Sequence, residues 1–355
     1  MKSKDTLLSD QVFQLNVFLW ALQELPDNSP TFPVLLKAGY CLHSIGQRVI
    51  MPVNTRFTDA LQKLTDSTNR SACRPDLWLK HTSDHVMLII ELKARGFSTN
   101  SSNRRQAIKL IAASANLAAS LGESGERPGQ VIYATTSTDA KELGETLKQL
   151  ALKIETENIP AAPVGVIGLS MEGEGVALSS PIPSDLPKPI ADTIANPAIV
   201  LMHNGENDIQ PLYFIPWIPG IQDTQDDNLH SAGLRELTAR LLTYIISKVG
   251  RTQVPNTLTI DINELLSAAT FGVFGHWRDS DRKQFCKAAA TIVERTLKSV
   301  TTVQGVGGSY LEIDLPDNEI QKAAIDRLEQ TDPANPTANL EATVTEQPTL
   351  FKPEG

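Results

Sequence analysis

Asp76, Glu91 and Lys93 are the residues of this sequence whose types and spacing best suit a chemical reaction. Asp76 follows Pro75, and Glu91 and Lys93 lie on either side of Leu92. Two carboxylates and a main-chain carbonyl, here that of Leu92, form the set of hard oxygen ligands that Mg²⁺ prefers while it keeps several waters. Such a metal lowers the pKa of a bound water, and a neighbouring ammonium stabilises charge on a phosphoryl oxygen. These residue types therefore indicate phosphodiester hydrolysis.

A β-hairpin would bring the three side chains together. Residues 74–80 and 86–93 are predicted to form two strands joined by a turn at 82–85. If the turn is centred between residues 83 and 84, paired residues have numbers that sum to 167, and Asp76 lies opposite Glu91. Cross-strand partners share a face, and so do alternate residues of one strand, so Lys93 projects from the same face at the open end of the hairpin. The opposite face carries side chains suited to a core: Leu77, Leu79, Leu88, Ile90 and Leu92.

Pro75-Asp76, Glu91 and Lys93, together with the order helix, strand, motif hairpin, helix and strand, resemble the PD-(D/E)xK nuclease superfamily. The resemblance covers about residues 30–170. It implies a restriction-endonuclease-like α/β fold, in which a mixed central sheet is flanked by helices. It also implies dependence on Mg²⁺, for which Mn²⁺ would substitute, and cleavage of DNA or, less often, RNA. Asp76, Glu91 and the Leu92 carbonyl would then bind the metal, and Lys93 would assist the attacking water.

Two further positions can be compared with the superfamily. Some of its branches place a glutamine on the helix after the Glu-x-Lys strand, and Gln106 lies at about that place in a helix predicted over 103–121. The tyrosine that often follows one turn later is Leu110 here, which leaves the branch undecided. An acid on an early helix is also common in the superfamily, and Glu24 is the candidate for it.

Basic side chains follow the motif closely. They would neutralise phosphates near the cut, or would form an ordinary solvated helix face. These residues are Arg95, Arg104, Arg105 and Lys109.

Two other interpretations of the motif stay open. The triplet could be an exposed hairpin end with a structural ion pair between Lys93 and Asp76 or Glu91. The chain could also be a catalytically inactive member of the same fold, which acts as a DNA-binding or complex-assembly protein.

The chain is predicted to contain two domains and a tail. A nuclease-like domain at 1–180 is followed by a proline-rich linker at 181–189, a second domain at 190–330 and a disordered tail at 331–355. In the first domain, helices are also expected over 11–25, 34–45 and 138–154, and strands over 48–53, 130–135 and 164–169.

The second domain resembles a winged helix. Its predicted order is helix 229–249, strand 257–260, helices 262–269 and 280–300, and a hairpin at 301–315. Ten basic and six acidic side chains lie between Arg235 and Tyr310, within a chain whose net charge is −9. A winged helix places its third helix in the major groove, although such domains also serve as protein-interaction modules. The basic residues expected to contact DNA are Arg278, Arg282, Lys283 and Lys287.

Composition narrows the class of protein. Of 355 residues, 41% are hydrophobic and 21% charged, which excludes a disordered chain, a fibre and a uniformly basic, histone-like protein. Three scattered cysteines form no disulfide framework, and no apolar run is long enough to cross a membrane, so a cytoplasmic protein is expected.

The resemblance to the nuclease superfamily and the two-domain plan imply a DNA endonuclease of prokaryotic restriction or anti-phage defence. A helicase or ATPase partner is expected for any translocation, because the chain carries no motor motif. Cutting both strands would favour a homodimer. The tail segment containing Gln347, Leu350 and Phe351 resembles the short peptide by which bacterial replication proteins bind the sliding clamp.

Overall fold

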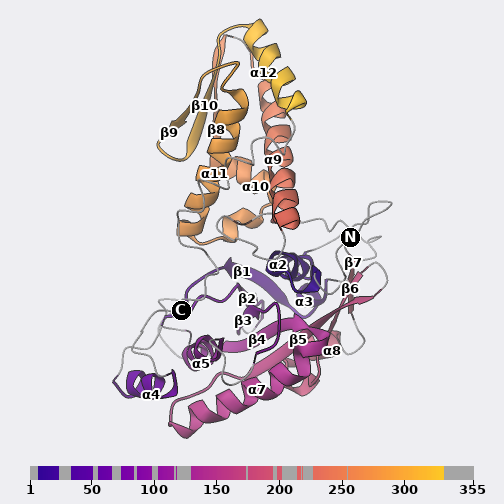
Figure 1. Ribbon diagram of the computed structural model, residues 1–355, viewed down its shortest axis with the longest axis vertical. Helices are drawn as coiled ribbons and strands as arrows, with labels where there is room; N and C mark the ends of the chain where they lie inside the picture. Colours follow the sequence, from indigo (N-terminus) through magenta and orange to yellow (C-terminus); the bar gives the residue numbers. More distant parts are fainter. Residues whose placement is uncertain are drawn as a thin grey trace. The chain divides into compact units, whose positions relative to one another are not determined.

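The computed structural model divides into two compact units between Leu212 and Tyr213 (Figure 1). The residues that the structure describes are 7–23, 33–50, 55–65, 73–83, 86–97, 103–115, 117, 129–172, 175–194, 198–201, 214–216, 218, 227–253 and 255–331.

Unit 1 is built on one mixed sheet of seven strands, whose spatial order follows the sequence from β1 to β7. The β3, β4 and β5 strands are parallel to one another, and the remaining pairs are antiparallel. The predicted α/β class with a mixed central sheet is therefore confirmed. The strands are β1 (Tyr40–Ile45), β2 (Leu77–His81), β3 (Met87–Leu92), β4 (Gly129–Thr136), β5 (Val164–Glu172), β6 (Gly175–Ser179) and β7 (Ala198–Leu201).

Helices cover both faces of this sheet (Figure 1). One face carries α2 (Gln11–Trp20) and α3 (Val34–Lys37). The other carries α4 (Thr55–Thr65), α5 (Asn103–Ser114) and α7 (Ser137–Thr156), which share a hydrophobic core with the strands beneath them. Two short helices, η1 (Pro183–Asp185) and α8 (Lys188–Thr193), follow β6.

The β2–β3 hairpin has the predicted register. Leu77 pairs with Ile90 and Leu79 with Leu88, so each pair sums to 167. The five apolar side chains expected on the core face are all buried. Asp76 stands directly before the first paired residue of β2, at the end of the hairpin that is away from the turn.

The predicted helix over 34–45 is wrong beyond its first turn. Helix α3 ends at Lys37, and Gly39 then adopts a φ of +85°, which an L side chain rarely takes. After this glycine the chain turns into β1, which pairs with β2 at the sheet edge. Of the strand expected over 48–53, Val49 forms one bridge to Cys73, and residues 51–54 lie outside the described part.

The proline-rich segment 181–189 belongs to unit 1. It contains η1 and the start of α8, and β7 beyond it joins the same sheet by pairing with β6. The division of the chain therefore falls later than residue 189.

Unit 2 contains the series of elements expected from the sequence, followed by one more helix. Its three strands form an antiparallel sheet in the order β8-β10-β9, and Gly307 and Gly308 form the β9–β10 turn with positive φ angles. The elements are α9 (Asp227–Val249), β8 (Asn256–Asp261), α10 (Ile262–Ala269), η2 (Val273–His276), α11 (Asp279–Leu297), β9 (Val303–Val306), β10 (Tyr310–Leu315) and α12 (Asn318–Gln330).

Neither unit has a described helix that combines the length and the apolar character needed to cross a lipid bilayer.

Candidate active site

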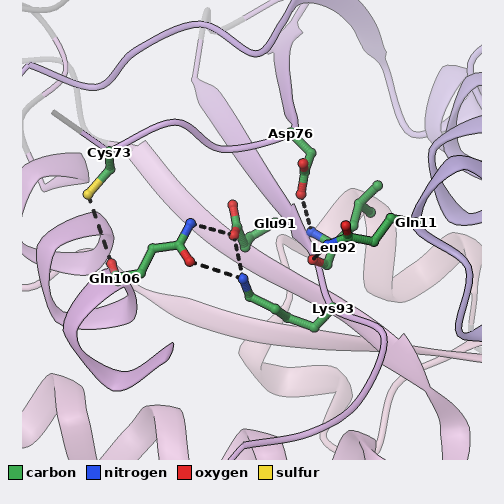
Figure 2. A network of polar contacts seen from close by, with 7 residues as sticks. All are labelled: Gln11, Cys73, Asp76, Glu91, Leu92, Lys93 and Gln106. Carbon is green, nitrogen blue, oxygen red and sulfur yellow. Dashed lines mark hydrogen bonds and ion pairs between the residues drawn. The ribbon is translucent and has the colours of Figure 1, made fainter. Parts of the chain in front are cut away.

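Glu91, Lys93 and Gln106 form one hydrogen-bonded cluster at the carboxyl end of β3. Lys93 Nζ lies 2.8 Å from Glu91 Oε1 and 3.1 Å from Gln106 Oε1. Gln106 Nε2, from α5, also donates to Glu91 Oε1 at 2.8 Å. Figure 2 shows the glutamine and the lysine converging on this one carboxylate oxygen. The other oxygen, Glu91 Oε2, is buried and has no hydrogen-bond partner among the described residues.

Asp76 binds the adjoining main chain. Its Oδ2 accepts a 2.6 Å hydrogen bond from the Leu92 N–H, so the carboxylate occupies the place that a further strand residue would take (Figure 2). Burial, and then the negative charge of Glu91, raise the pKa of Asp76 well above its ordinary value, while the Leu92 N–H and Lys93 oppose the rise.

Both carboxylates are more buried than an open hairpin end predicts. Asp76 and Glu91 are each 3% exposed. The reason is the layer of helices above this face, since α5 places Gln106 directly against Glu91. The Lys93 side chain is 12% exposed and that of Glu91 4%, so solvent reaches the cluster from the side of Lys93.

The structure thus gathers Asp76, Glu91, Lys93 and Gln106 as the sequence predicted. It also contains the Lys93–Glu91 ion pair of the alternative interpretation, but in a buried setting.

Two glutamines of α2 contribute contacts that the sequence did not suggest. Gln11 Nε2 lies 3.3 Å from the Leu92 carbonyl oxygen, the predicted third metal ligand (Figure 2). Gln14 Nε2 donates to the Lys93 carbonyl at 3.0 Å, and the Lys93 N–H donates to Ala134 in β4. The main chain that presents Glu91 and Lys93 is therefore held from two sides. The sequence signal for these contacts was Gln14, which is a polar residue within the apolar series of this helix.

Tyr133 and Thr135 of β4 are two more buried polar residues beside the cluster. Neither hydroxyl has a partner among the described residues. Tyr133 is paired with Glu91 in the parallel β3–β4 ladder. The sequence signal for these two residues was that polar side chains occupy alternate positions at the carboxyl end of the strand predicted over 130–135.

The basic residues expected near the cut differ in their placement. Arg95 and Arg105 are exposed, and Lys109 is half-buried one turn after Arg105 on α5. Arg104 instead donates to the Leu64 carbonyl at the end of α4, at 2.9 Å, and so serves packing between helices.

In unit 2, two of the four predicted DNA contacts are engaged in local ion pairs. Arg278 pairs with the buried Asp281, and Arg282 pairs with Asp279. Lys283 and Lys287 are exposed one turn apart on α11.

Some predicted residues lie outside the described part of the chain. They are Glu24 and the tail residues Gln347, Leu350 and Phe351.

The residues present fit a divalent cation. Each carboxylate has one oxygen fixed by a donor, and Glu91 Oε2 has no partner in the described structure. A cation would offset the burial and the repulsion from Glu91 that raise the pKa of Asp76. The described residues contain no group of three or more His, Cys, Asp and Glu side chains suited to a metal. Asp76 and Glu91 would therefore hold the ion together with main-chain oxygen and water, as Mg²⁺ tolerates.

No protein-family model matches the chain, and neither a curated protein nor a solved structure does.

Proposed function

We propose that this chain is a metal-dependent endodeoxyribonuclease, in which Asp76 and Glu91 hold Mg²⁺ or Mn²⁺. The observation that carries the proposal is a pair of buried carboxylates, Asp76 and Glu91, beside a single lysine, with Glu91 Oε2 left without a hydrogen-bond partner in the described structure. A structural ion pair needs one acid and one base. A second buried acid beside it destabilises the fold unless a cation joins the group. Carboxyl groups perturbed in this way concentrate at functional sites.

The chain's own side chains would orient and stabilise the reacting groups. When bound, the metal would polarise a phosphoryl oxygen and acidify a water. Two of the three Lys93 N–H donors are directed to Glu91 and Gln106, which leaves one for the attacking water or the phosphoryl oxygen. Gln106 touches both Lys93 and Glu91, so it acts as a positioning residue.

Basic side chains support DNA as the substrate. Arg95 and Arg105 are exposed near the site in unit 1, where they can meet phosphates. In unit 2, the helix order and the sheet order β8-β10-β9 are those of a winged helix, in which α11 would enter the major groove. Its exposed Lys283 and Lys287 are suited to that contact.

A catalytically inactive DNA-binding protein is the second candidate. It is favoured by one observation, the ion pair between Lys93 and Glu91, which is complete without a metal.

Incubation of the full chain with supercoiled plasmid separates the two candidates. We expect nicking with Mg²⁺ or Mn²⁺ and none with EDTA. Asp76→Asn and Lys93→Gln should each reduce the rate at least about 100-fold, because each removes a charge that faces the reacting phosphate.

The exposed ion pair Lys188–Asp192 provides matched controls. Lys188→Gln and Asp192→Asn should cut like the parent chain. Retardation of the plasmid in a gel without any cleavage would favour the inactive protein. Cleavage that persists in both site variants would place the reaction elsewhere.

A further inference from the structure

Three polar atoms that have no hydrogen-bond partner among the described residues lie on two adjacent strands in unit 1. They are Glu91 Oε2 on β3 and the hydroxyl oxygens of Tyr133 and Thr135 on β4. All three residues are at most 3% exposed. A buried polar group without a hydrogen bond is destabilising, and such groups are rare in folded proteins. The presence of three such groups on two neighbouring strands of one sheet indicates that they serve the same site.

The strand register places these groups on one face. Glu91 and Tyr133 are partners in the parallel β3–β4 ladder, and the next pair is Leu92 with Ala134. Tyr133 and Thr135 are alternate residues of β4, so they project to the same face as Glu91 and Lys93. The face is also that of the core beneath α5 and α7, to which Tyr133 belongs.

The phenol of Tyr133 is held in a defined orientation. Its ring packs edge-on against Phe97, with 5.9 Å between the centroids. Burial, followed by the charges of Glu91, Cys73 and Asp76, raises the pKa of Tyr133 well above its ordinary value. The hydroxyl therefore keeps its proton and can act as a donor.

We infer that Tyr133 is a positioning residue of this site, whose hydroxyl donates to Glu91 Oε2 in the cation-binding state. Lys93 and Gln106 already engage Oε1, so Oε2 is the oxygen left for a metal. A hydroxyl that holds one lone pair of Oε2 directs the other toward the ion, as outer partners of metal ligands commonly do. The inference rests on the proposed function, and it adds a residue to the site.

The test compares Tyr133→Phe with the parent chain in two thermal measurements. In EDTA, Tyr133→Phe should not lower the melting temperature, because without a cation the hydroxyl has no partner among the described residues. In a titration with Mn²⁺ alone, the concentration that gives half of the thermal shift should rise about 10-fold or more. Tyr310→Phe, at an exposed position of unit 2, should change neither quantity.

Each outcome decides the inference. A lower melting temperature of Tyr133→Phe in EDTA would mean that the hydroxyl stabilises the fold without a cation, and would overturn it. An unchanged Mn²⁺ midpoint would mean that the hydroxyl does not assist cation binding, and would also overturn it. If the parent chain shows no Mn²⁺ response at all, the cation site itself fails, and the inference fails with it. Failure of the inference alone leaves the parent response to Mn²⁺ intact.

Discussion

At the scale of single residues, the site is defined by an imbalance of charge. Asp76 and Glu91 are buried with one lysine, and the pKa of Asp76 is raised by burial and by Glu91. An ordinary salt bridge would leave no such excess of acid. The sequence predicted that Asp76, Glu91 and Lys93 meet because they lie on one local hairpin with a visible alternation. Gln106 was expected there only from the resemblance to the nuclease superfamily. The sequence did not predict the contact of Gln11 with Leu92, because 81 positions separate the two residues.

The raised pKa of Asp76 makes a prediction about stability. In the unfolded chain the group titrates near 3.8, and its pKa in the folded protein is higher. Protonation of Asp76 therefore contributes stability to the folded protein that is fully present below pH 3.8. This contribution is lost as the pH rises through the pKa of Asp76 in the folded protein. Asp76→Asn keeps an acceptor for the Leu92 N–H and removes the charge. At pH 7 in EDTA, we expect it to melt about 2–4 °C higher than the parent chain.

Melting curves from pH 4 to pH 8 test the predicted direction of this change in melting temperature. The difference between Asp76→Asn and the parent chain should be small near pH 4 and should grow with pH. Asp192→Asn, at an exposed ion pair, should show no such trend. A variant that is less stable than the parent at pH 7 would mean that the ionised carboxylate stabilises the fold, contrary to our account.

At the scale of elements, the turn between β2 and β3 made the pairing of these two strands predictable from the sequence. The β2–β3 register follows from the position of one turn and from alternation, and it is confirmed. The β1 strand was missed because residues 34–45 favour a helix until Gly39 stops it. The last two strands of the sheet, β6 and the edge strand β7, were missed for a different reason, since each depends on a neighbour for its pairing.

Two glycines of unit 1 should respond to alanine with opposite signs. Gly39 has a φ of +85°, and an added Cβ would lie 2.7 Å from His81 Nε2. Gly39→Ala should lower the free energy of unfolding by about 1–2 kcal/mol, the cost of a left-handed backbone. Gly144 lies within α7, where an added Cβ would make an ordinary 3.7 Å contact with Val166. Gly144→Ala should therefore raise the free energy of unfolding by about 0.5–1 kcal/mol. Urea denaturation measures both, and equal effects would contradict the role of Gly39 as the helix stop.

At the scale of the whole molecule, two units carry complementary features. Unit 1 holds the acidic cluster, and unit 2 holds a three-stranded sheet beside a helix with exposed lysines. In our proposal the first unit cuts the DNA that the second unit binds. Both parts of the proposal require a cation at Asp76 and Glu91.

Calorimetric titration of Mn²⁺ into the full chain tests that requirement most directly. The account predicts one saturable site per chain in the parent protein, and binding at least about 10-fold weaker in Asp76→Asn. Asp192→Asn should bind like the parent. Absence of saturable binding in the parent chain, or equal binding by Asp76→Asn, would contradict the account.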